Sequence, residues 1–410
     1  MSGAVSDPIR LVLFAGVLTF ALAGCAPQKG DQSGSSASTG APSSGGQTAF
    51  AGEEIPVGEY ASLTGGQAGF GQTTHNGMSM AIDEINASGG VNGKKLKLYT
   101  EDDESNADKV KTVVTKLITQ NKVVAVLGEV ASSRSITAAP VCEQYGVPMI
   151  SPSSTNPDVT VNKTTGKVRE KIFRVCFIDP FQGHAMAKFM REKLKVQRVA
   201  VFRDVKQDYS KGLADFFVKT FTEKGGSIVK DVSYSTGDTD FRAQLTAIKA
   251  ANPQAVFIPG YYGEVGPMAK QARELGLTVP LAGGDGWDDP KVVEVGGKAI
   301  EGCYITNHYS VDSQDPVSKT FVDNYKKKYG QGPNALAALG YDTAMLLKDA
   351  ITRAKSTDGV SLTKAIAETK GLPGVTGNVT FDASHNNSGK PAVILQYRGG
   401  KQVLVDTVQP

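Results

Sequence analysis

Short apolar segments alternate with segments whose apolar residues recur at helical spacing. Three strand and helix pairs come first: Ile55 to Tyr60 with Asn76 to Ala87, Leu96 to Thr100 with Asp108 to Gln120, and Val123 to Leu127 with Ser133 to Tyr145. Alternation of this kind predicts a parallel sheet with right-handed crossovers and helices on both faces. The first half of the chain is therefore predicted to form a doubly wound α/β lobe.

A second series of the same kind follows two further apolar segments. Those segments are Val147 to Ile150 and Phe173 to Phe177. The new pairs are Arg198 to Phe202 with Ser210 to Glu223, Ser227 to Val232 with Phe241 to Ala250, and Ala255 to Ile258 with Val265 to Leu275. Two such series predict two similar lobes, and ligands of open parallel sheets bind beyond the carboxyl ends of the strands. The sequence thus predicts a binding cleft between the lobes.

Composition supports this organisation. The 410 residues, 40% hydrophobic and 21% charged, suffice for two domain-sized cores. The 44 basic and 41 acidic residues are interspersed, so no stretch favours nucleic acid.

The N-terminal region has the pattern of an exported protein. Arg10 precedes the apolar run from Leu11 to Ala23, which is too short to span a bilayer and reads as a signal peptide. Gly24 and Cys25 follow, and the stretch Leu22 to Cys25 looks like the lipobox of bacterial lipoproteins, in which the cysteine carries lipid. An ordinary signal peptide with a chance cysteine is the alternative. Residues from Ala26 to about Gly52 are rich in Gly, Ser, Ala, Thr and Pro, which predicts a flexible tether.

Enzyme signatures are scarce. The four histidines lack the spacing of a metal site, no GxSxG nucleophile turn occurs, and neither GxGxxG nor GK[ST] is present. The segment Gly65 to Gly71 is predicted to be a glycine-rich turn that lets backbone approach a ligand, or simply a turn. Cys142, Cys176 and Cys303 are predicted to pack in the core, with one disulfide possible.

Polar loops follow several predicted strands. Ser132 and Ser133 stand at a predicted helix N-terminus, which favours a ligand carboxylate unless one of them caps its own helix. Ser151 to Pro157 forms a second hydroxyl-rich loop beside the first. In the second lobe Tyr209 and Tyr261 follow strands, and Asp285 lies in a glycine-rich loop, where it is either a partner for an ammonium group or part of an Asx turn.

Several segments in order resemble a known family, the periplasmic substrate-binding proteins of branched-chain amino acid ABC transporters. The resemblance runs from about Ile55 to near the C-terminus and is carried by GGQAGFG, AIDEINASGGVNGKKLKL, the pair Asp102 and Asp103, LGEVASS, PMISPSSTNP, FRVCFID, DYSKGL, PGYYGEVGPMAKQAR and GGDGW. It implies the type I fold of periplasmic binding proteins, with two lobes joined by three crossovers and the ligand in the cleft. The implied divisions are a signal peptide at 1–24, a lipidated cysteine and tether at 25–53, lobe 1 at 54–177 plus 308–373, and lobe 2 at 178–307 plus 374–410.

The resemblance also implies roles for individual residues. Ser132 and Thr155 would bind the α-carboxylate and α-ammonium of an amino acid, helped by backbone groups around Ser153 and Ser154. Asp285 would neutralise the ammonium from the other lobe. Two tyrosines, Tyr209 and Tyr261, would close over the ligand, and Phe70 would pack on its side chain.

Two departures from the family are visible. Asp285 stands where the leucine/isoleucine/valine-binding proteins usually have a glutamate, and a disulfide frequent in the family is absent because Ser105 or Asn106 and Ala131 occupy its positions. The resemblance implies a monomeric, lipid-anchored binding protein in the periplasm or on the outer face of the membrane. It would capture a branched-chain or other apolar amino acid and deliver it to ABC permease subunits, without enzymatic activity, cofactor or metal. A binding protein for amides, urea or short aliphatic acids, a ligand-dependent partner of a sensor protein, and an exported enzyme are the alternatives.

Overall fold

Residues 53–410 are described by a computed structural model. Residues 1–52, which hold the predicted signal peptide, Cys25 and tether, lie outside the described residues. Among the described residues, no helix has the length and apolar content needed to span a membrane.

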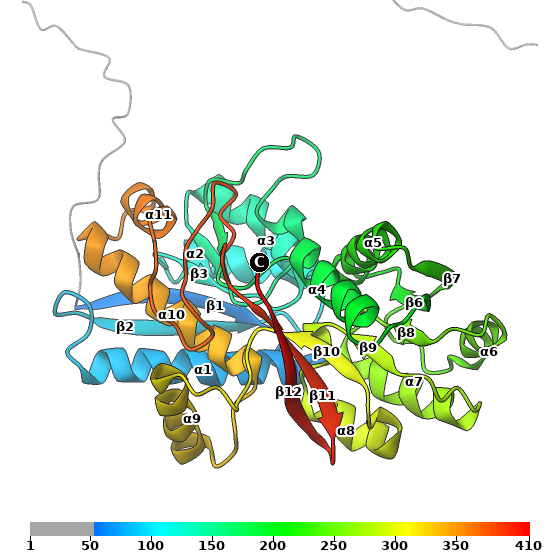
Figure 1. The fold of residues 1–410 in the computed structure, drawn as a ribbon. Coiled ribbons are helices and arrows are strands. Elements are labelled where there is room, and N and C mark those ends of the chain that lie inside the picture. The colour runs from blue at the N-terminus through cyan, green and yellow to red at the C-terminus, as the bar shows by residue number, and fades with distance from the viewer. Residues whose placement is uncertain (1–52) are drawn as a thin grey trace, which may run out of the picture. The chain divides into compact units, whose positions relative to one another are not determined.

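The first lobe is built on a parallel sheet with the strand order β2-β1-β3-β4-β5 (Figure 1). Its strands are β1 (Glu54–Ala61), β2 (Lys95–Asp102), β3 (Val126–Leu127), β4 (Met149–Ser151) and β5 (Ile172–Arg174). The helices of this lobe are α1 (Ala68–Ala87), α2 (Ala107–Thr119), α3 (Ser132–Tyr145), α9 (Pro316–Tyr329), α10 (Ala335–Ala354) and α11 (Gly359–Ala367), with the short η1 (Pro157–Val159).

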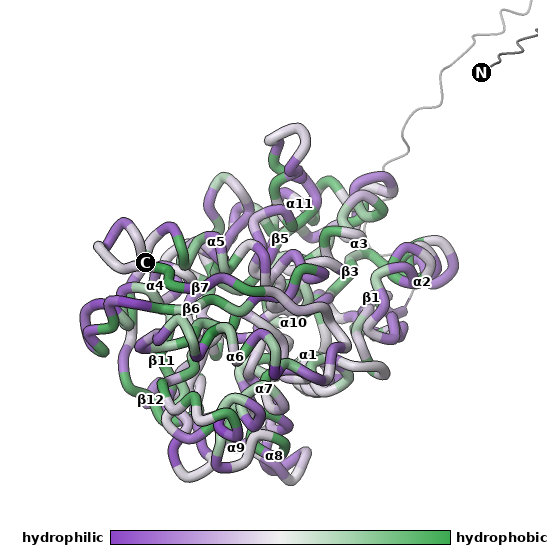
Figure 2. The backbone as a smooth tube through the Cα atoms, turned by 90° about the vertical axis from the view of Figure 1, so that its right-hand side faces the viewer, coloured by the Kyte–Doolittle hydropathy of each residue, from purple (hydrophilic) through white to green (hydrophobic). Residues whose placement is uncertain are grey.

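Alternation along the strands divides the core between the two faces of this sheet. Leu127 and Ile150 belong to the hydrophobic cluster that contains α1 and α10, whereas Val126 and Met149 belong to the cluster that contains α2 and α3. Figure 2 shows hydrophobic segments along strands such as β3 and β6, while hydrophilic positions recur along outer helices such as α2. Burial on both faces explains why the strands read as short apolar runs.

The second lobe repeats this strand order and extends it. Its sheet has the order β12-β11-β10-β9-β8-β6-β7, in which β6 to β10 are parallel and the C-terminal pair β11 and β12 is antiparallel. The strands are β6 (Arg198–Asp204), β7 (Ser227–Tyr234), β8 (Ala255–Phe257), β9 (Leu281–Gly283), β10 (Tyr304–Asn307), β11 (Ala392–Arg398) and β12 (Lys401–Val408). The helices are α4 (Asp179–Glu192), α5 (Asp208–Glu223), α6 (Arg242–Ala250), α7 (Tyr262–Glu274) and α8 (Pro290–Gly296), with η2 (Asp285–Trp287) and η3 (Gly297–Ile300).

The chain passes between the two sheets three times. The first two passages follow β5 and β10, and the third precedes β11. The third lies later than the boundary predicted at Pro373, because the segment after it still packs on the first lobe. Val375 N–H donates to Asp342 of α10 at 2.7 Å, and Asn387 Nδ2 donates to the carbonyl of Val175 at 2.9 Å. These contacts join residues far apart in the sequence, so no local sequence pattern indicates them. They place the third passage just before Ala392.

Every predicted strand is present, but one predicted turn is helical. Helix α1 begins at Ala68 rather than Asn76, so most of the predicted glycine-rich turn forms its first turn. Its glycines serve close packing: a Cβ on Gly71 would collide with the carbonyl of Ser62. The low helix propensity of glycine argues against a helix that begins here, but tertiary packing outweighs this propensity. Cys142, Cys176 and Cys303 are buried free thiols, which confirms their predicted place in the core and leaves none in a disulfide.

Candidate ligand-binding site

Loops at the carboxyl ends of strands in both sheets meet around a small cavity. It is lined by Phe70, Val130, Ser153, Tyr209, Tyr261, Asp285, Gly286 and Leu336. Five of these are predicted site residues, and they come from both lobes. The cavity has a volume of about 10 Å³, which is at the lower limit for holding one water molecule. An amino acid therefore enters only if the lobes move apart.

Asp285 is the centre of the hydrogen bonding in the cleft. Its Oδ1 accepts from Gln182 Nε2 at 2.7 Å and from Tyr209 Oη at 2.9 Å. Its Oδ2 is 2.9 Å from His308 Nε2 and accepts a longer bond of 3.4 Å from Ser153 Oγ of the other lobe. Burial alone would raise the pKa of this carboxyl, but the bonds from His308, Gln182 and Tyr209 outweigh it and lower the pKa. Asp285 is therefore ionised at neutral pH.

Ser132 stands at the start of α3 and is 1% exposed. The N-cap residue of this helix is Ala131, and no side chain caps it, so the helix-capping alternative is not what the structure shows. Ser132 Oγ instead accepts from Asn156 N at 3.2 Å, and Ser133 Oγ accepts from Asp208 N of the other lobe at 3.0 Å. Helix α3 thus begins two residues after Val130, which lines the cavity, and the dipole at a helix N-terminus favours an anion.

The loop after β4 contributes three predicted residues with different contacts. Ser153 Oγ faces Asp285 across the cleft. Ser154 Oγ binds Ser135 Oγ at 2.7 Å and the carbonyl of Glu129 at 2.8 Å, so its side chain ties this loop to the β3–α3 loop and does not line the cavity. Thr155 Oγ1 is buried without a hydrogen-bond partner.

Asp179, at the start of α4, was not predicted from the sequence. It is fully buried, and neither carboxylate oxygen has a hydrogen-bond partner. Burial raises its pKa well above the ordinary range, and the nearby charge of Asp285 acts in the same direction, whereas Thr155 and Arg174 oppose the rise. The pKa values of these two carboxyl groups are therefore shifted in opposite directions, down for Asp285 and up for Asp179.

Aromatic rings form the apolar part of the site. Phe70 of α1 makes edge contacts with Tyr261 and Tyr262, with ring centroids 5.7 and 4.7 Å apart. Tyr209 stacks on Tyr261 at 5.0 Å and 12°. Burial raises the pKa of Tyr209 and Tyr261, so both phenols are neutral. These rings bring the two lobes together around an apolar pocket.

Known proteins share this architecture. A family model described as periplasmic binding protein matches residues 54–402. The leucine-, isoleucine-, valine-, threonine- and alanine-binding protein of Pseudomonas aeruginosa is 32% identical, over 81% of this chain and 87% of that protein. The chain belongs to the periplasmic binding protein family.

Solved structures agree with this assignment. The leucine-binding protein of Thermotoga maritima is 40% identical, with a TM-score of 0.82 over 87% of this chain and 99% of that one. A branched-chain amino acid transporter substrate-binding protein of Streptococcus pneumoniae, in complex with isoleucine, is 35% identical with a TM-score of 0.81 over 87% and 100% of the two chains. The predicted type I fold is confirmed, and this periplasmic binding protein is a solute-binding component of transport outside the cytoplasm rather than an enzyme.

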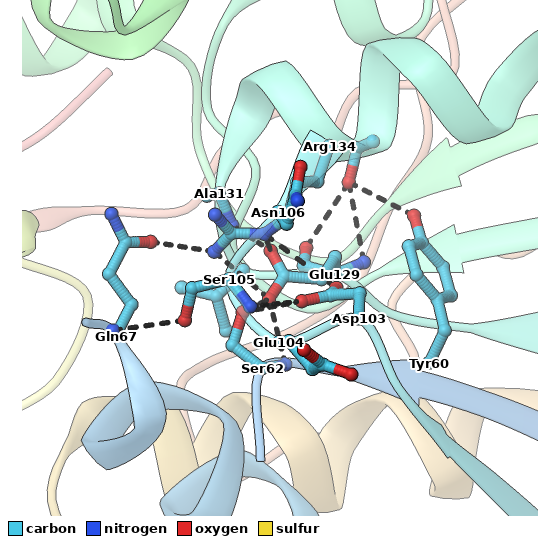
Figure 3. A network of polar contacts seen from close by, with 12 residues as sticks. Tyr60, Ser62, Gln67, Asp103, Glu104, Ser105, Asn106, Glu129, Ala131 and Arg134 are labelled. Atoms are coloured by element: carbon cyan, nitrogen blue, oxygen red, sulfur yellow. Dashed lines mark hydrogen bonds and ion pairs between the residues drawn. The ribbon is translucent and has the colours of Figure 1, made fainter. Parts of the chain in front are cut away.

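A buried network of charged and polar side chains connects the segments that follow β1, β2 and β3 in this periplasmic binding protein (Figure 3). Arg134 Nη2 donates to Gln67 Oε1 at 2.6 Å and to Glu129 Oε1 at 3.1 Å, and Arg134 Nε lies 3.7 Å from Asp103 Oδ2. Ser62 Oγ joins the two carboxylates, at 2.8 Å from Asp103 and 2.9 Å from Glu129. Burial, followed by the charge of Glu129, raises the pKa of Asp103 to about 7, although Arg134 opposes the rise.

This network occupies the place where the family's disulfide is expected. Ser105 Oγ accepts from Gln67 N at 3.0 Å, and Ala131 N–H donates to Glu129 Oε2 at 2.6 Å. The loops carrying Ser105 and Ala131 are therefore joined through polar contacts. Buried charges need partners of opposite charge, because an unpaired one is costly.

Several other residues of the site were not predicted from the sequence. Gln182 and His308 bind Asp285 from α4 and from the end of β10, and Leu336 lines the cavity from α10. The position of His308 directly after a strand is the one clue that points to it, because the ends of neighbouring parallel strands meet at the same edge. Among residues 53–410, no group of His, Cys, Asp or Glu side chains is placed to hold a metal ion.

Proposed function

We propose that this periplasmic binding protein is the solute-binding component of an ABC importer and captures a branched-chain or other apolar amino acid when its lobes close. The observation that carries the proposal is the ionised Asp285, which faces the hydroxyl-rich loops of the other lobe across an aromatic cavity. A buried anion opposite a helix N-terminus matches the two opposite charges of an amino acid zwitterion.

Each end of the zwitterion has a counterpart in the cleft. The carboxylate is assigned to the first N–H groups of α3 and the hydroxyl of Ser132, and the ammonium to Asp285 and Thr155. The buried Thr155 hydroxyl supports this assignment, because it has no hydrogen bond within 3.5 Å and acts only on the nearby Asp179 carboxyl, whose pKa it lowers. The side chain would lie against Phe70, Tyr261 and the other apolar residues that line the cavity.

Relatives support the choice of ligand and partners. Relatives 30% to 32% identical are named for binding leucine, either alone or together with isoleucine and valine, and the Streptococcus pneumoniae protein holds isoleucine. The proposal extends to delivery of the amino acid to permease subunits by a monomer that Cys25 anchors to the membrane through lipid. Asp285 has a shorter side chain than the usual glutamate, so the choice among apolar amino acids rests on the experiment below.

The test is calorimetric titration of residues 53–410, which lie within one compact unit, after unfolding and refolding to remove carried-over ligand. We expect micromolar affinity for leucine, isoleucine or valine. Binding of 4-methylpentanoate, which lacks the ammonium, and of 3-methylbutylamine, which lacks the carboxylate, should be weaker by about 1 to 3 kcal/mol, because each leaves a buried group unpaired.

Asp285→Asn separates this reading from the alternatives. It keeps the shape of the side chain but removes its charge, and we expect it to abolish measurable leucine binding. Asp204→Asn is the matched control, because Asp204 is also buried at a strand end of the second lobe but does not line the cavity. If no amino acid binds, or if acetamide, urea or a short aliphatic acid binds more tightly than leucine, the amino-acid proposal fails.

A further inference from the structure

His308 connects the candidate ammonium site to the segments that join the lobes. It directly follows β10, where the chain passes to the first lobe for the second time, and its side chain is fully buried. One face of its ring stacks on Phe177, with centroids 3.7 Å apart and planes at 27°. Phe177 lies in the first passage, between β5 and α4. Two passages are thus in contact through this ring.

The imidazole has one hydrogen bond from its side chain, and that bond goes to Asp285. Nε2 is 2.9 Å from Asp285 Oδ2, whereas Nδ1 is buried without a partner. Burial lowers the pKa of His308, against the opposing effect of Asp285, so the ring is neutral and has a single N–H. Because Asp285 is an ionised acceptor, that hydrogen is on Nε2. A neutral donor here adds no positive charge to repel a ligand ammonium.

The bond from His308 also decides which part of Asp285 faces the cleft. Gln182 and Tyr209 occupy Oδ1, and His308 occupies one side of Oδ2. The remaining contact of Oδ2 is the 3.4 Å bond from Ser153, the only one of the four that comes from the loops of the first lobe. The free side of the carboxylate therefore points across the cleft.

We propose that His308 is a positioning residue that aims Asp285 Oδ2 at the ligand ammonium and ties that carboxylate to the hinge. Three of the four donors to Asp285 fix the carboxylate on the second lobe, and His308 alone among them also packs on another passage between the lobes. The inference rests on the proposed function, since it concerns the same ammonium site. It adds a residue that never needs to touch the ligand.

The test compares His308→Phe and His308→Gln in titrations with leucine and with 4-methylpentanoate. Phenylalanine keeps a ring on Phe177 but has no donor, and glutamine replaces the donor with an amide N–H. We expect His308→Phe to weaken leucine binding by about 10- to 150-fold, the range for a hydrogen bond to a charged group. Glutamine should restore most of the affinity. Binding of 4-methylpentanoate should be unchanged by either substitution, because it has no ammonium.

His385→Phe is the matched control. His385 also stacks on a phenylalanine, Phe173, with centroids 4.2 Å apart, but its Nδ1 contacts the carbonyls of Arg169 and Ile172 in the first lobe. This control should leave leucine affinity unchanged. The inference is overturned if His308→Phe binds leucine like the wild type, if both ligands lose the same factor, or if glutamine does not restore binding. Failure of the wild type to bind any amino acid would instead overturn the proposed function.

Discussion

Gly69 offers a direct test of lobe closure. It lies in the first turn of α1, and its N–H donates to Tyr262 Oη of the other lobe at 3.0 Å. A Cβ at this position would overlap Asp289 Oδ2, and would lie 3.0 Å from Asp289 Cγ and 3.2 Å from Tyr262 Oη. Gly69→Ala therefore places one methyl group as a wedge between lobes while the rest of α1 keeps its contacts.

The expected loss of ligand affinity in Gly69→Ala follows from the contacts that the methyl group disrupts. Asp289 Oδ1 accepts from Lys291 N at 2.9 Å as the N-cap of α8, and displacing the carboxylate loses about 1 kcal/mol of capping. Loss of the Gly69 to Tyr262 hydrogen bond costs about 1 kcal/mol more. Closure then becomes less favourable by about 2 kcal/mol, which lowers ligand affinity about 30-fold if binding requires closure.

The wedge should impair binding without weakening the fold. Alanine favours a helix over glycine by about 1 kcal/mol, so thermal stability without ligand should stay constant or rise. Calorimetry with leucine measures the affinity, and small-angle X-ray scattering measures whether saturating leucine still reduces the radius of gyration. Asp289→Ser in the alanine background removes the overlapping Oδ2 and keeps a capping residue, so it should recover most of the affinity.

Gly66→Ala is the matched control for this experiment. Gly66 precedes the same helix, and a Cβ there would meet no atom within 4 Å. Its affinity should equal that of the wild type. Wild-type affinity in Gly69→Ala, or an equal loss in both variants, would refute the claim that this contact forms on closure.

Two further predictions concern charged groups in the first lobe. A hydrogen bond from His75 to Glu59 raises the pKa of His75, so the pair stabilises the fold fully below the unfolded pKa of about 6.5 and loses this contribution as pH rises through the folded pKa. His75→Gln should make the free energy of unfolding, measured in urea titrations, depend less on pH across that window. An unchanged pH dependence would contradict this prediction. Arg134→Met should cost about 3 to 5 kcal/mol of unfolding free energy, because Glu129 and Asp103 lose their buried partner; a loss under about 1 kcal/mol would show that the network does not hold the loops.

Much of the fold was predictable because the local pattern of apolar and polar residues indicates the strands and helices. Strands buried on both faces leave short apolar runs, and their alternation with helices predicts the parallel order of β1 to β5 and of β6 to β10. The start of α1 was not predictable, since Gly69 and Gly71 argue against a helix until the atoms packed against them are known. The late third passage depends on bonds such as Asn387 to Val175, which join residues far apart in sequence.

The site was predictable to the extent that strand ends reveal it. Ser153, Tyr209, Tyr261 and Asp285 lie in loops or at the starts of helical segments that follow strands, and all line the cavity. The sequence does not predict which side-chain atoms contact one another within those segments. The adjacent residues Ser153 and Ser154 show this. The hydroxyl of Ser153 donates to Asp285, whereas that of Ser154 donates to the backbone carbonyl of Glu129. Side-chain direction at this scale depends on packing from both lobes.

The unequal bonds around Asp285 indicate how a ligand would favour closure. The three donors from Gln182, Tyr209 and His308 lie at 2.7 to 2.9 Å, whereas Ser153 of the first lobe lies at 3.4 Å. Closure without an ammonium thus joins the lobes at this point through one long hydrogen bond from an uncharged hydroxyl. A ligand ammonium in its place would form a shorter, charge-assisted bond to the same oxygen. Since a ligand shifts an equilibrium only by its differential affinity for the two states, this exchange is where an amino acid would stabilise the closed state.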